Sequence, residues 1–450
     1  MASNKRASEP NSRGSGGIEA SLDKYFQLKK NGTDIRTEAL AGLTTFLTMV
    51  YIIFVNPSIL AKAGMDHGAV FVATCIAAAV CSIVMGLYAN YPIALAPGMG
   101  LNAFFAFTVV LSYKYTFQQA LAAVFLSGVL FFLLSVTGLR EYVINTIPRN
   151  LKYAIGAGVG LFLGIIALEE AKIIVDHPVT LVTLGDLRNP APLLCLLGFV
   201  LIVALNVRNV IGATLIGILV VALIGIPLGL AKFSGVVSMP PSLAPTFLQL
   251  DFSRTFELSF LVIVFSILMI DVFDNAGTLI AVTEKAGFVD KQGNLPRMKQ
   301  ALISDSFAAM FGAAIGTSTT TSYIESAAGV SAGGRTGLTA VFVGILFLLA
   351  LFFSPLAGMI PGYASAAALL FVACVMASLL ANMEWDDLTE AAPAVIAAIT
   401  MPLTYSIATG IGLGFITYVL IKLLSGRVND VSLPVAGLAA IFAIKFGLTQ

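Results

Sequence analysis

Apolar runs of about 20 residues, long enough to cross a bilayer as helices, recur along almost the whole chain. Hydrophobic residues make up 58% of the sequence and charged residues 11%, whereas a soluble domain carries about 25% charged residues. We therefore predict an all-α polytopic membrane protein. We expect fourteen transmembrane segments, seven on each side of a polar loop: 38–60, 68–88, 91–111, 117–137, 150–170, 190–208, 210–230, 257–283, 297–315, 316–333, 336–359, 362–382, 390–407 and 408–425. The sequence leaves open whether a last apolar piece, 432–447, also crosses.

Lysine and arginine are distributed unevenly about these segments. With a cytoplasmic N-terminus, 18 of the 25 Lys and Arg residues lie on the cytoplasmic side and 6 outside, which is the bias that the positive-inside rule describes. The first twenty residues lack the hydrophobic core of a secretory signal, so we expect a disordered tail. The expected location is the cell membrane, which in a bacterium is the inner membrane.

The composition also argues against several partners. A net charge of +1 offers no basic stripe for nucleic acid. The two histidines and four cysteines show no spacing typical of a metal site. We therefore expect no nucleic acid, no metal and no other cofactor.

Two segments do not resemble ordinary spanning helices. The segment at 91–107 begins extended, breaks at Pro97 and Gly98, and only then becomes helical, and the segment at 316–329 places a threonine run before a helix of small residues. They are third in the first set of seven and third in the second. Because seven is odd, the two sets run through the membrane in opposite directions. Interrupted segments at matching places in two halves indicate a transporter binding site.

Four ionisable residues lie within the predicted membrane-spanning segments, where a charge is energetically unfavourable. Asp271 and Asp274 lie in segment 8, Asp305 in segment 9, and Glu325 opens the half-helix of segment 10. An ionisable group in mid-membrane costs at least about 2.5–3.5 kcal/mol on insertion scales and is functional by default. The alternative is a polar network that only holds helices together. For Asp305 we favour that alternative, with the carboxylate accepting hydrogen bonds from the threonine run.

The helix 8 residues share one face. Asp271, Asp274, Asn275 and Thr278 follow an i, i+3, i+4, i+7 pattern, so two carboxylates, an amide and a hydroxyl look the same way. This set suits a neutral ligand, because carboxylates accept N–H donors and amides donate to carbonyl groups, while no mid-membrane Arg or Lys is present to pair with an anion.

Two further features complete the predicted site. One of Phe104, Phe105 and Phe107 can offer an aromatic face to a flat ring. Buried carboxylates far from cations readily take up a proton, so Asp271, Asp274 and Glu325 are candidate proton carriers for symport.

The chain resembles the azaguanine/purine permease (AzgA-like) branch of the nucleobase–cation symporters, from about Tyr25 to Lys422. The resemblance is carried by the motifs GLTTFLTMVY at 42–51, APGMGLNAFF at 96–105, DVFDNAGTL at 271–279 and GTSTTTSYIESAAGV at 316–330. It implies two inverted seven-helix repeats arranged as a core domain and a gate domain. It also implies that the core moves against the gate in an elevator-type cycle, often in a homodimer, and carries substrate with a proton.

The domain boundaries follow from this resemblance. We expect a tail at 1–37, the core at 38–137 and 257–359, the gate at 138–231 and 360–425, and a C-terminal apolar segment of unassigned topology at 426–450.

The resemblance also implies the substrate site. It assigns purine contacts to Glu325 and to the helix 8 carboxylates, with backbone at Phe105 and near Ile324 helping to hold the base. Thr45 and Thr278 complete the candidate ligands. Thr278 occupies the place of a proton-linked histidine in uracil-permease relatives, so the proton route differs here.

Asn102 resembles the residue found in guanine/hypoxanthine-type permeases. A 6-oxopurine offers a carbonyl acceptor and an N1–H donor, which suit an amide donor and a carboxylate acceptor, and adenine has the opposite polarity at both places. The sequence thus predicts a transporter that imports hypoxanthine or guanine with protons.

Three alternatives remain. The first is an adenine-preferring permease. The second is an anion transporter or channel of the same architecture, which needs a cation that the site lacks. The third is an intramembrane aspartyl protease, which needs a Gly-x-Gly-Asp motif that is absent, so no enzyme is expected.

Overall fold

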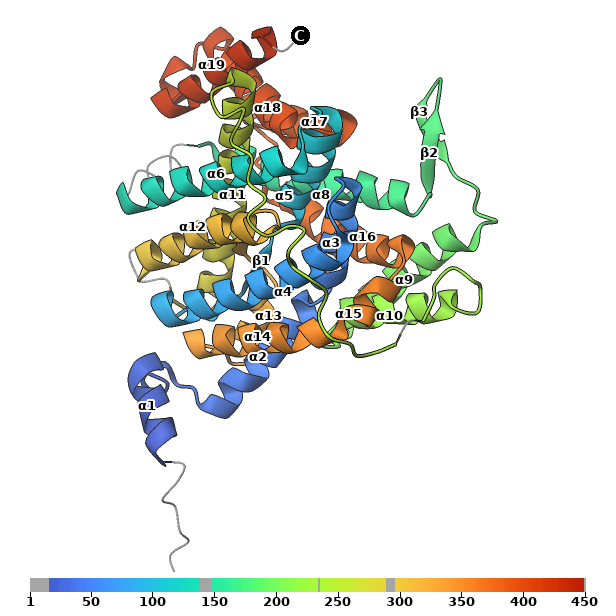
Figure 1. The fold of residues 1–450 in the computed structure, drawn as a ribbon. Coiled ribbons are helices and arrows are strands. Elements are labelled where there is room, and N and C mark those ends of the chain that lie inside the picture. Colours follow the sequence, from blue (N-terminus) through green and yellow to red (C-terminus); the bar gives the residue numbers. More distant parts are fainter. Residues whose placement is uncertain (1–15, 138–146, 234, 289–295, 449–450) are drawn as a thin grey trace, which may run out of the picture.

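The computed structural model describes residues 16–137, 147–233, 235–288 and 296–448, and it is built largely from helices packed side by side (Figure 1). Within these ranges, eight helices are long and apolar enough to cross a membrane: Ile35–Lys62, His67–Ala89, Phe117–Thr137, Arg149–Glu170, Pro190–Val207, Gly337–Met359, Gly362–Asn382 and Ile407–Leu424. Each coincides with a predicted segment. The all-α membrane architecture is therefore confirmed, and the count of fourteen crossings stays a prediction.

The helices pack in two groups. In the first group α12 packs on α6, and α14 packs on α2 and α4. In the second group α16 and α17 pack on α8. The first group comprises α2 (Ile35–Met49), α3 (Ile52–Lys62), α4 (His67–Val84), α6 (Phe117–Thr137), α11 (Leu258–Lys285), α12 (Met298–Ile315), α14 (Gly337–Ala350) and α15 (Ser354–Met359). The second comprises α8 (Arg149–Glu170), α9 (Pro190–Val207), α10 (Ala213–Gly225), α16 (Gly362–Ala377), α17 (Leu388–Leu403) and α18 (Ile407–Leu424).

Small residues bring the helices of the second group close together. A Cβ added at Gly158 would lie 3.0 Å from Ala398 Cα, and one at Gly160 would lie 3.0 Å from the carbonyl oxygen of Ala373. Since lipid tails are as apolar as leucine, close backbone packing is a main source of helix association in membranes. Glycine on α8 permits this close packing against α16 and α17.

The two interrupted segments meet at the centre of the first group. One consists of strand β1 (Leu95–Pro97), helix α5 (Met99–Ala103) and π-helix η3 (Phe104–Ser112). The other consists of strand β4 (Thr320–Ser322) and helix α13 (Ser326–Ser331). The strands pair antiparallel, with Ala96 opposite Thr321. The predicted strand-plus-half-helix form of both segments is confirmed.

The N-terminal tail differs from the prediction. Helix α1 (Gly16–Phe26) begins inside the twenty residues that we expected to be disordered. Phe26 and Leu28 are buried against Leu338, so apolar contacts with α14 hold this segment. Residues 1–15 lie outside the described part of the chain.

The remaining elements are short or connect and extend the main helices. They are η1 (Lys29–Asn31), η2 (Met85–Ala89), η4 (Leu351–Phe353), η5 (Ser378–Asn382), η6 (Val428–Asp430), the hairpin of β2 (Ile174–His177) and β3 (Leu181–Leu184), and the terminal helix α19 (Leu433–Leu448). The hairpin projects from the bundle at the right of Figure 1.

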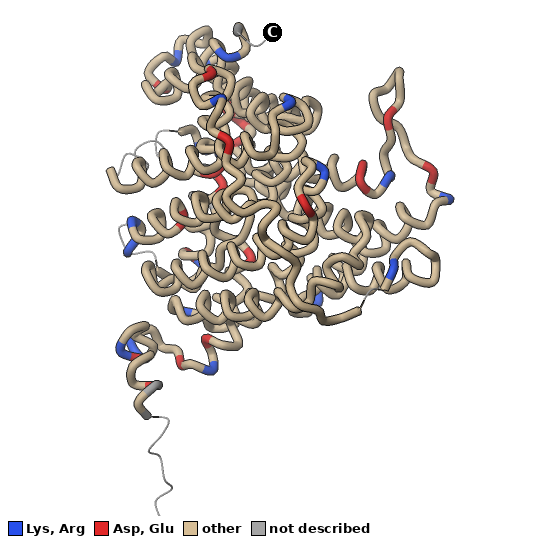
Figure 2. The backbone as a smooth tube through the Cα atoms, in the orientation of Figure 1, with Lys and Arg blue, Asp and Glu red and all other residues tan. Residues whose placement is uncertain are grey.

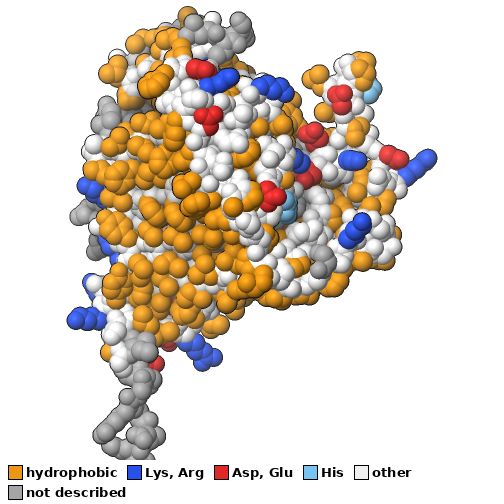
Figure 3. All heavy atoms as spheres, viewed as in Figure 1, with side chains coloured by type: hydrophobic (Ala, Val, Ile, Leu, Met, Phe, Trp, Pro, Cys, Tyr) orange, Lys and Arg blue, Asp and Glu red, His pale blue; other side chains and the backbone are white. Residues whose placement is uncertain are grey.

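The surface fits a membrane environment. Figure 3 shows hydrophobic side chains covering a broad area of one face of the bundle. Along the backbone, charged residues are sparse, and many lie near helix ends and connections (Figure 2). This distribution leaves the middle of the bundle apolar on the outside, so the few carboxylates in its interior stand out.

Candidate functional site

The short β1–β4 ladder holds the two half-helices together. Beyond the paired residues, Gly98 N donates to Thr319 O at 2.9 Å, and Tyr323 N donates to Ala94 O at 2.9 Å. The hydroxyl of Tyr323 also donates to Pro97 O at 2.5 Å. Non-helical backbone at membrane depth is tolerated only where protein or a water-filled cavity satisfies it. Here the partner strand supplies part of the hydrogen bonds, and side chains of neighbouring helices, such as Ser82 for Leu95, supply others.

Glu325 stands at the N-cap of α13. Its carboxylate accepts a 2.5 Å hydrogen bond from the hydroxyl of Tyr51, a buried residue between α2 and α3. Glu325 itself is only partly buried. Its carboxylate therefore lies at an edge of the packed interior, oriented by a tyrosine from the first half of the chain.

The predicted face of α11 turns inward. Asp271, Asn275 and Thr278 are buried, and Asp274 is partly exposed. Helix α11 packs against α13, whose N-cap is Glu325, so Asp274 and Glu325 lie on two contacting elements. The structure thus brings the helices of these two carboxylates together. Asp271 lies about one turn away on the same helix.

Asn102 has an unusual environment. It is fully buried in α5, and its Oδ1 accepts a hydrogen bond from the hydroxyl of Ser318. Its Nδ2 has no hydrogen-bond partner among the described residues, and neither polar atom of the Asn275 amide has one. A buried polar group without a partner costs about 1–3 kcal/mol. These amides therefore have donors and an acceptor available for a ligand or water.

The other predicted ligands, Thr45, Phe105 and Ile324, differ in their surroundings. Thr45 is buried against Gly329 of α13, which has no room for a Cβ beside the threonine hydroxyl. Phe105 is buried within the apolar core, so only its backbone could face a ligand. The Ile324 side chain is 48% exposed next to Glu325. Thr45 therefore positions α13, while Ile324 lies beside the carboxylates.

Asp305 accepts hydrogen bonds from Ser322, directly after the threonine run, rather than from the predicted threonines. Its Oδ1 accepts hydrogen bonds from the backbone N–H and from the hydroxyl of Ser322, both at 3.0 Å. Ser322 is the last residue of β4. Asp305 therefore fixes the strand from α12.

Sequence reasoning missed several polar residues that build the site. The Tyr51 hydroxyl was one of them. Asn56 of α3 is another, since its Nδ2 donates to Thr74 Oγ1 at 2.7 Å and to Thr317 Oγ1 at 2.8 Å. Both lie within the predicted span 38–60, and a polar group within a predicted membrane span was the signal that could have identified them.

A third missed residue is Glu38. Its carboxylate is fully buried and accepts from the backbone N–H of Arg335, Thr336 and Thr339 at 2.9, 3.3 and 3.1 Å and from the Thr339 hydroxyl at 2.5 Å. It thereby caps α14. Arg335 donates to the carbonyl groups of Val330, in α13, and of Gly334, just beyond its end, so it anchors the end of this helix.

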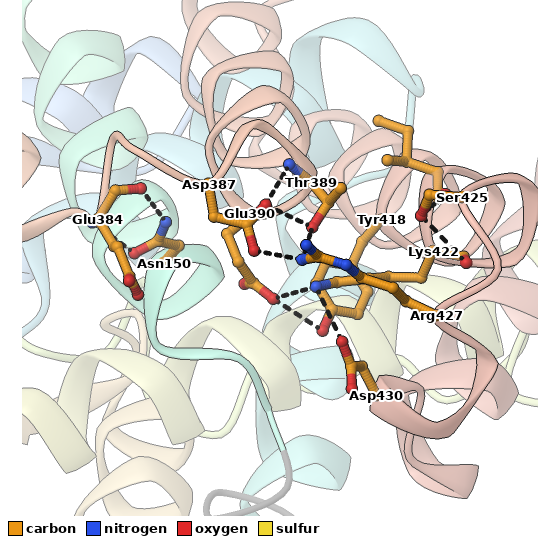
Figure 4. A network of polar contacts seen from close by, with 11 residues as sticks. Asn150, Glu384, Asp387, Thr389, Glu390, Tyr418, Lys422, Ser425, Arg427 and Asp430 are labelled. Atoms are coloured by element: carbon orange, nitrogen blue, oxygen red, sulfur yellow. Dashed lines mark hydrogen bonds and ion pairs between the residues drawn. The ribbon is translucent and has the colours of Figure 1, made fainter.

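Two acidic residues at helix ends are paired with lysines and shielded from solvent. Glu170 pairs with Lys62 at 3.4 Å, and its side chain is only 8% exposed. Glu390 pairs with Lys422, which is buried, at 2.7 Å (Figure 4). No group of three or more His, Cys, Asp or Glu that could hold a metal occurs in the described ranges.

Two helical groups with strand-interrupted segments meeting at the centre, and carboxylates where they meet, define a secondary transporter architecture. A family model described as "Permease family" (Xan_ur_permease) matches residues 36–413. The chain belongs to this permease family.

Similar proteins match almost the full length. A putative permease of Methanocaldococcus jannaschii is 53% identical over 94% of this chain and 98% of its own. The adenine permease AdeP of Escherichia coli is 50% identical over 94% and 95%. The guanine/hypoxanthine permease PbuG of Bacillus subtilis is 45% identical over 94% and 99%.

Solved structures share the fold at low identity. The murine Slc26a9 anion transporter in its inward-facing state has a TM-score of 0.66 at 11% identity, covering 94% of this chain and 77% of that one. The transmembrane domain of the cyanobacterial bicarbonate transporter BicA has a TM-score of 0.62 at 16% identity, covering 84% and 96%. These likenesses agree with the core-and-gate fold.

Proposed function

We propose that this permease carries purine nucleobases across the membrane together with protons, and that it prefers the 6-oxopurines hypoxanthine and guanine. The observation that carries the proposal is that α11, which bears Asp274 and the unpaired amide of Asn275, packs against α13, which Glu325 caps, and against α5, which bears the unpaired Nδ2 of Asn102. A carboxylate accepts the ring N–H groups of a base, and an amide Nδ2 donates to its carbonyl oxygen.

The orientation of Asn102 supports the oxopurine preference. Ser318 donates to Oδ1, which leaves Nδ2 as the group available to a ligand. An N–H donor pairs with the 6-oxo group and not with the 6-amino group of adenine.

Proton coupling rests on the pair of carboxylates. A negative charge on one carboxylate disfavours a second charge on its neighbour, so protonation of one of the two is favourable. Moving the site through the membrane with one charge neutralised also lowers the electrostatic cost of the movement. Glu325, Asp274 and, one turn further, Asp271 are the proposed proton carriers.

Alternating access is proposed as movement of a core (38–137 and 257–359) against a gate (138–231 and 360–425). Among the described residues, the side-chain hydrogen bonds and ion pairs that join the two helical groups lie at one end of the bundle. Glu170 binds Lys62 and Ser58, and the Thr108 hydroxyl donates to Tyr405 O at 2.8 Å. Polar contacts that close the bundle at this end are consistent with a substrate site that opens toward the opposite end.

A second candidate is a preference for adenine. The 50% identity to the adenine permease AdeP exceeds the 45% identity to the guanine/hypoxanthine permease PbuG. Both candidates use the same carboxylates, and they differ in the polarity required at Asn102.

Uptake of radiolabelled hypoxanthine into cells that express the chain tests the proposal. Unlabelled guanine, adenine, xanthine and uracil serve as competitors, and an uncoupler removes the proton gradient. Glu325→Gln and Asp274→Asn should reduce uptake at least tenfold. Glu284→Gln is a matched control, because Glu284 is exposed on the same helix as Asp274.

Each outcome has a distinct meaning. Entry of hypoxanthine with guanine as the best competitor, suppressed by the uncoupler and by both variants, supports the proposal in full. If adenine competes better than guanine, the second candidate, a preference for adenine, is supported instead. If the uncoupler leaves uptake unchanged, proton coupling is contradicted. If the folded protein takes up none of the bases, nucleobase transport itself is contradicted.

A further inference from the structure

Beyond α18, the chain continues through η6 into α19, an apolar helix of 16 residues. No Asp, Glu, Lys or Arg occurs from Leu433 to Ile444. Val435 and Phe442 are buried against the bundle, whereas Ile441 and Ile444 are exposed. The helix is therefore apolar on the packed side and on the open side, unlike a helix lying at the membrane surface, which needs a polar face.

The beginning of α19 is fixed at the end of α18. Lys422, near the last residue of α18, pairs with Asp430 at 3.4 Å and with Glu390 at 2.7 Å, and Arg427 pairs with Asp387 at 2.6 Å (Figure 4). This polar network ties the 427–430 connection to the first turn of α17. It places the start of α19 beside Lys422.

The end of α19 lies at the opposite end of α18. A Cβ added at Gly412, in the second turn of α18, would lie 2.7 Å from the Phe442 ring and 2.9 Å from Phe446. The ammonium of Lys445 stands 5.9 Å from the centre of the Tyr113 ring. Figure 1 shows α19 packed beside α18 with the C-terminus marked at its end.

Tyr113 marks the Tyr405 end of the bundle. Its backbone N–H donates to Thr108 O, and the Thr108 hydroxyl donates to Tyr405 O, immediately before α18 begins. The helix α19 thus starts near Lys422, finishes near Tyr113, and runs antiparallel to α18 along its length.

From this geometry we propose that α19 crosses the membrane in addition to the fourteen predicted segments, so that α2 begins on one face and α19 ends on the opposite face. The helix α18 is long and apolar enough to span, and its antiparallel neighbour traverses the same depth. At the other end of the chain, α3 ends at Lys62, whose ammonium lies 5.5 Å from the Phe107 ring centre and pairs with Glu170. The α2–α3 unit therefore begins on the Lys422 face and ends on the Tyr113 face.

The surroundings of α19 agree with a position in hydrocarbon. Together with α6 and α11 it borders an open apolar groove that includes Leu133, Leu268 and Leu438. A 16-residue helix spans about 24 Å, against a hydrocarbon thickness of about 30 Å. Local thinning of the bilayer absorbs the difference.

Cysteine accessibility in intact cells tests the crossing. Cys374 is the exposed native cysteine, whereas Cys75, Cys81 and Cys195 are buried, so the full-length Cys374→Ala protein is the background. Ser425→Cys reports the start of the C-terminal segment, and Gln450→Cys reports the chain end. A membrane-impermeant maleimide should label Gln450→Cys in intact cells and label Ser425→Cys at least tenfold less until the cells are permeabilised.

The comparison between the two sites decides the outcome. Opposite responses in intact cells support the crossing, including the reversed pattern, which would only invert the predicted orientation of the whole protein. Equal responses at both sites, labelled or protected, would overturn it. Monodisperse elution in detergent shows that both variants are folded, and a cysteine-free variant sets the background labelling.

Discussion

Tyr51 and Glu325, 274 positions apart in the chain, are joined by a hydrogen bond of 2.5 Å from the tyrosine hydroxyl to the carboxylate. The bond links the α2–α3 junction with the N-cap of α13, so the orientation of the proposed ligand carboxylate depends on the first membrane segment. Since Glu325 is partly exposed and Tyr51 is buried, the tyrosine acts as the fixed partner.

Replacement of Tyr51 by Phe should weaken substrate binding. A hydrogen bond to a charged group contributes about 1.5–3 kcal/mol, so the KM for uptake should rise by roughly 10- to 100-fold. Initial uptake rates over a range of substrate concentrations measure this effect. Tyr25→Phe is the control, because Tyr25 is exposed and donates only to Leu87 O. An unchanged KM would mean that Glu325 needs no such orientation.

Substitution at Asn102 should alter the order of competitors. Asn102→Asp replaces the free Nδ2 donor by an acceptor, so adenine should gain and hypoxanthine should lose by about tenfold each, equivalent to about 1.4 kcal/mol. Competition curves against one labelled base report both changes. Asn206→Asp, at an exposed position of α9, should leave the order intact. A parallel loss of all bases would assign Asn102 to packing rather than selectivity.

Glu38 should be important for stability. Its removal in Glu38→Ala leaves three buried N–H groups and a hydroxyl without their acceptor. Each unsatisfied group costs about 1–3 kcal/mol, so the free energy of unfolding should fall by about 3 kcal/mol or more. Thermal unfolding of detergent-purified protein should show a clearly lower Tm than for Glu19→Ala, a change at an exposed position. Equal Tm values would contradict the capping role.

The Arg427–Asp387 pair should be insensitive to physiological pH. The hydroxyl and backbone N–H of Thr389, together with Arg427, lower the pKa of Asp387 to about 2. A carboxyl with a depressed folded-state pKa contributes stability above its unfolded pKa of about 3.9 and loses it only as the pH falls toward 2. The Tm difference between the wild-type protein and Arg427→Gln should therefore stay constant from pH 5 to pH 8. A difference that disappears by pH 5 would contradict this assignment.

The Lys62–Glu170 pair should restrict opening at its end of the bundle. Lys62→Met removes a charge that is paired at 3.4 Å and leaves Glu170 without its cation. Ile324→Cys, beside the proposed site, should then react several-fold faster with an impermeant maleimide added outside cells in the Cys374→Ala background. Lys172→Met, at an exposed position, is the matched control. An unchanged labelling rate would show that the Lys62–Glu170 pair does not restrict opening.

Much of this architecture follows from local signals in the sequence. Long apolar runs predicted the helices, and Pro97, Gly98 and the threonine run predicted where two of them break, because these are backbone preferences of neighbouring residues. The i, i+3, i+4, i+7 spacing likewise predicted the inward face of α11.

Contacts between distant segments were harder to predict. The hydrogen bond between Tyr51 and Glu325 joins residues 274 positions apart, and the bond between Glu38 and Arg335, just before α14, joins residues 297 positions apart. No periodicity in either segment predicts these contacts. The ion pairs of Glu170 and Glu390 were also missed, because a carboxylate at a helix end looks the same in sequence whether it meets water or a lysine.

The β1–β4 ladder imposes an order of assembly. Strand β1 emerges from the ribosome long before β4, and its peptide groups have no helical partners within their own segment. The peptide groups of Leu95 bond to Ser82 in the first half, but Pro97 O and Gly98 N find their partners only at Tyr323 and Thr319. Unpaired peptide groups cost several kcal/mol each in lipid, so the first interrupted segment is incompletely satisfied until those residues are made. Until Thr320–Ser322 is synthesised, the unpaired peptide groups of that segment must be hydrated or shielded from lipid by other helices. The proposed substrate site is thus among the last parts of the protein to form, and a chain truncated before β4 lacks the strand that pairs with β1.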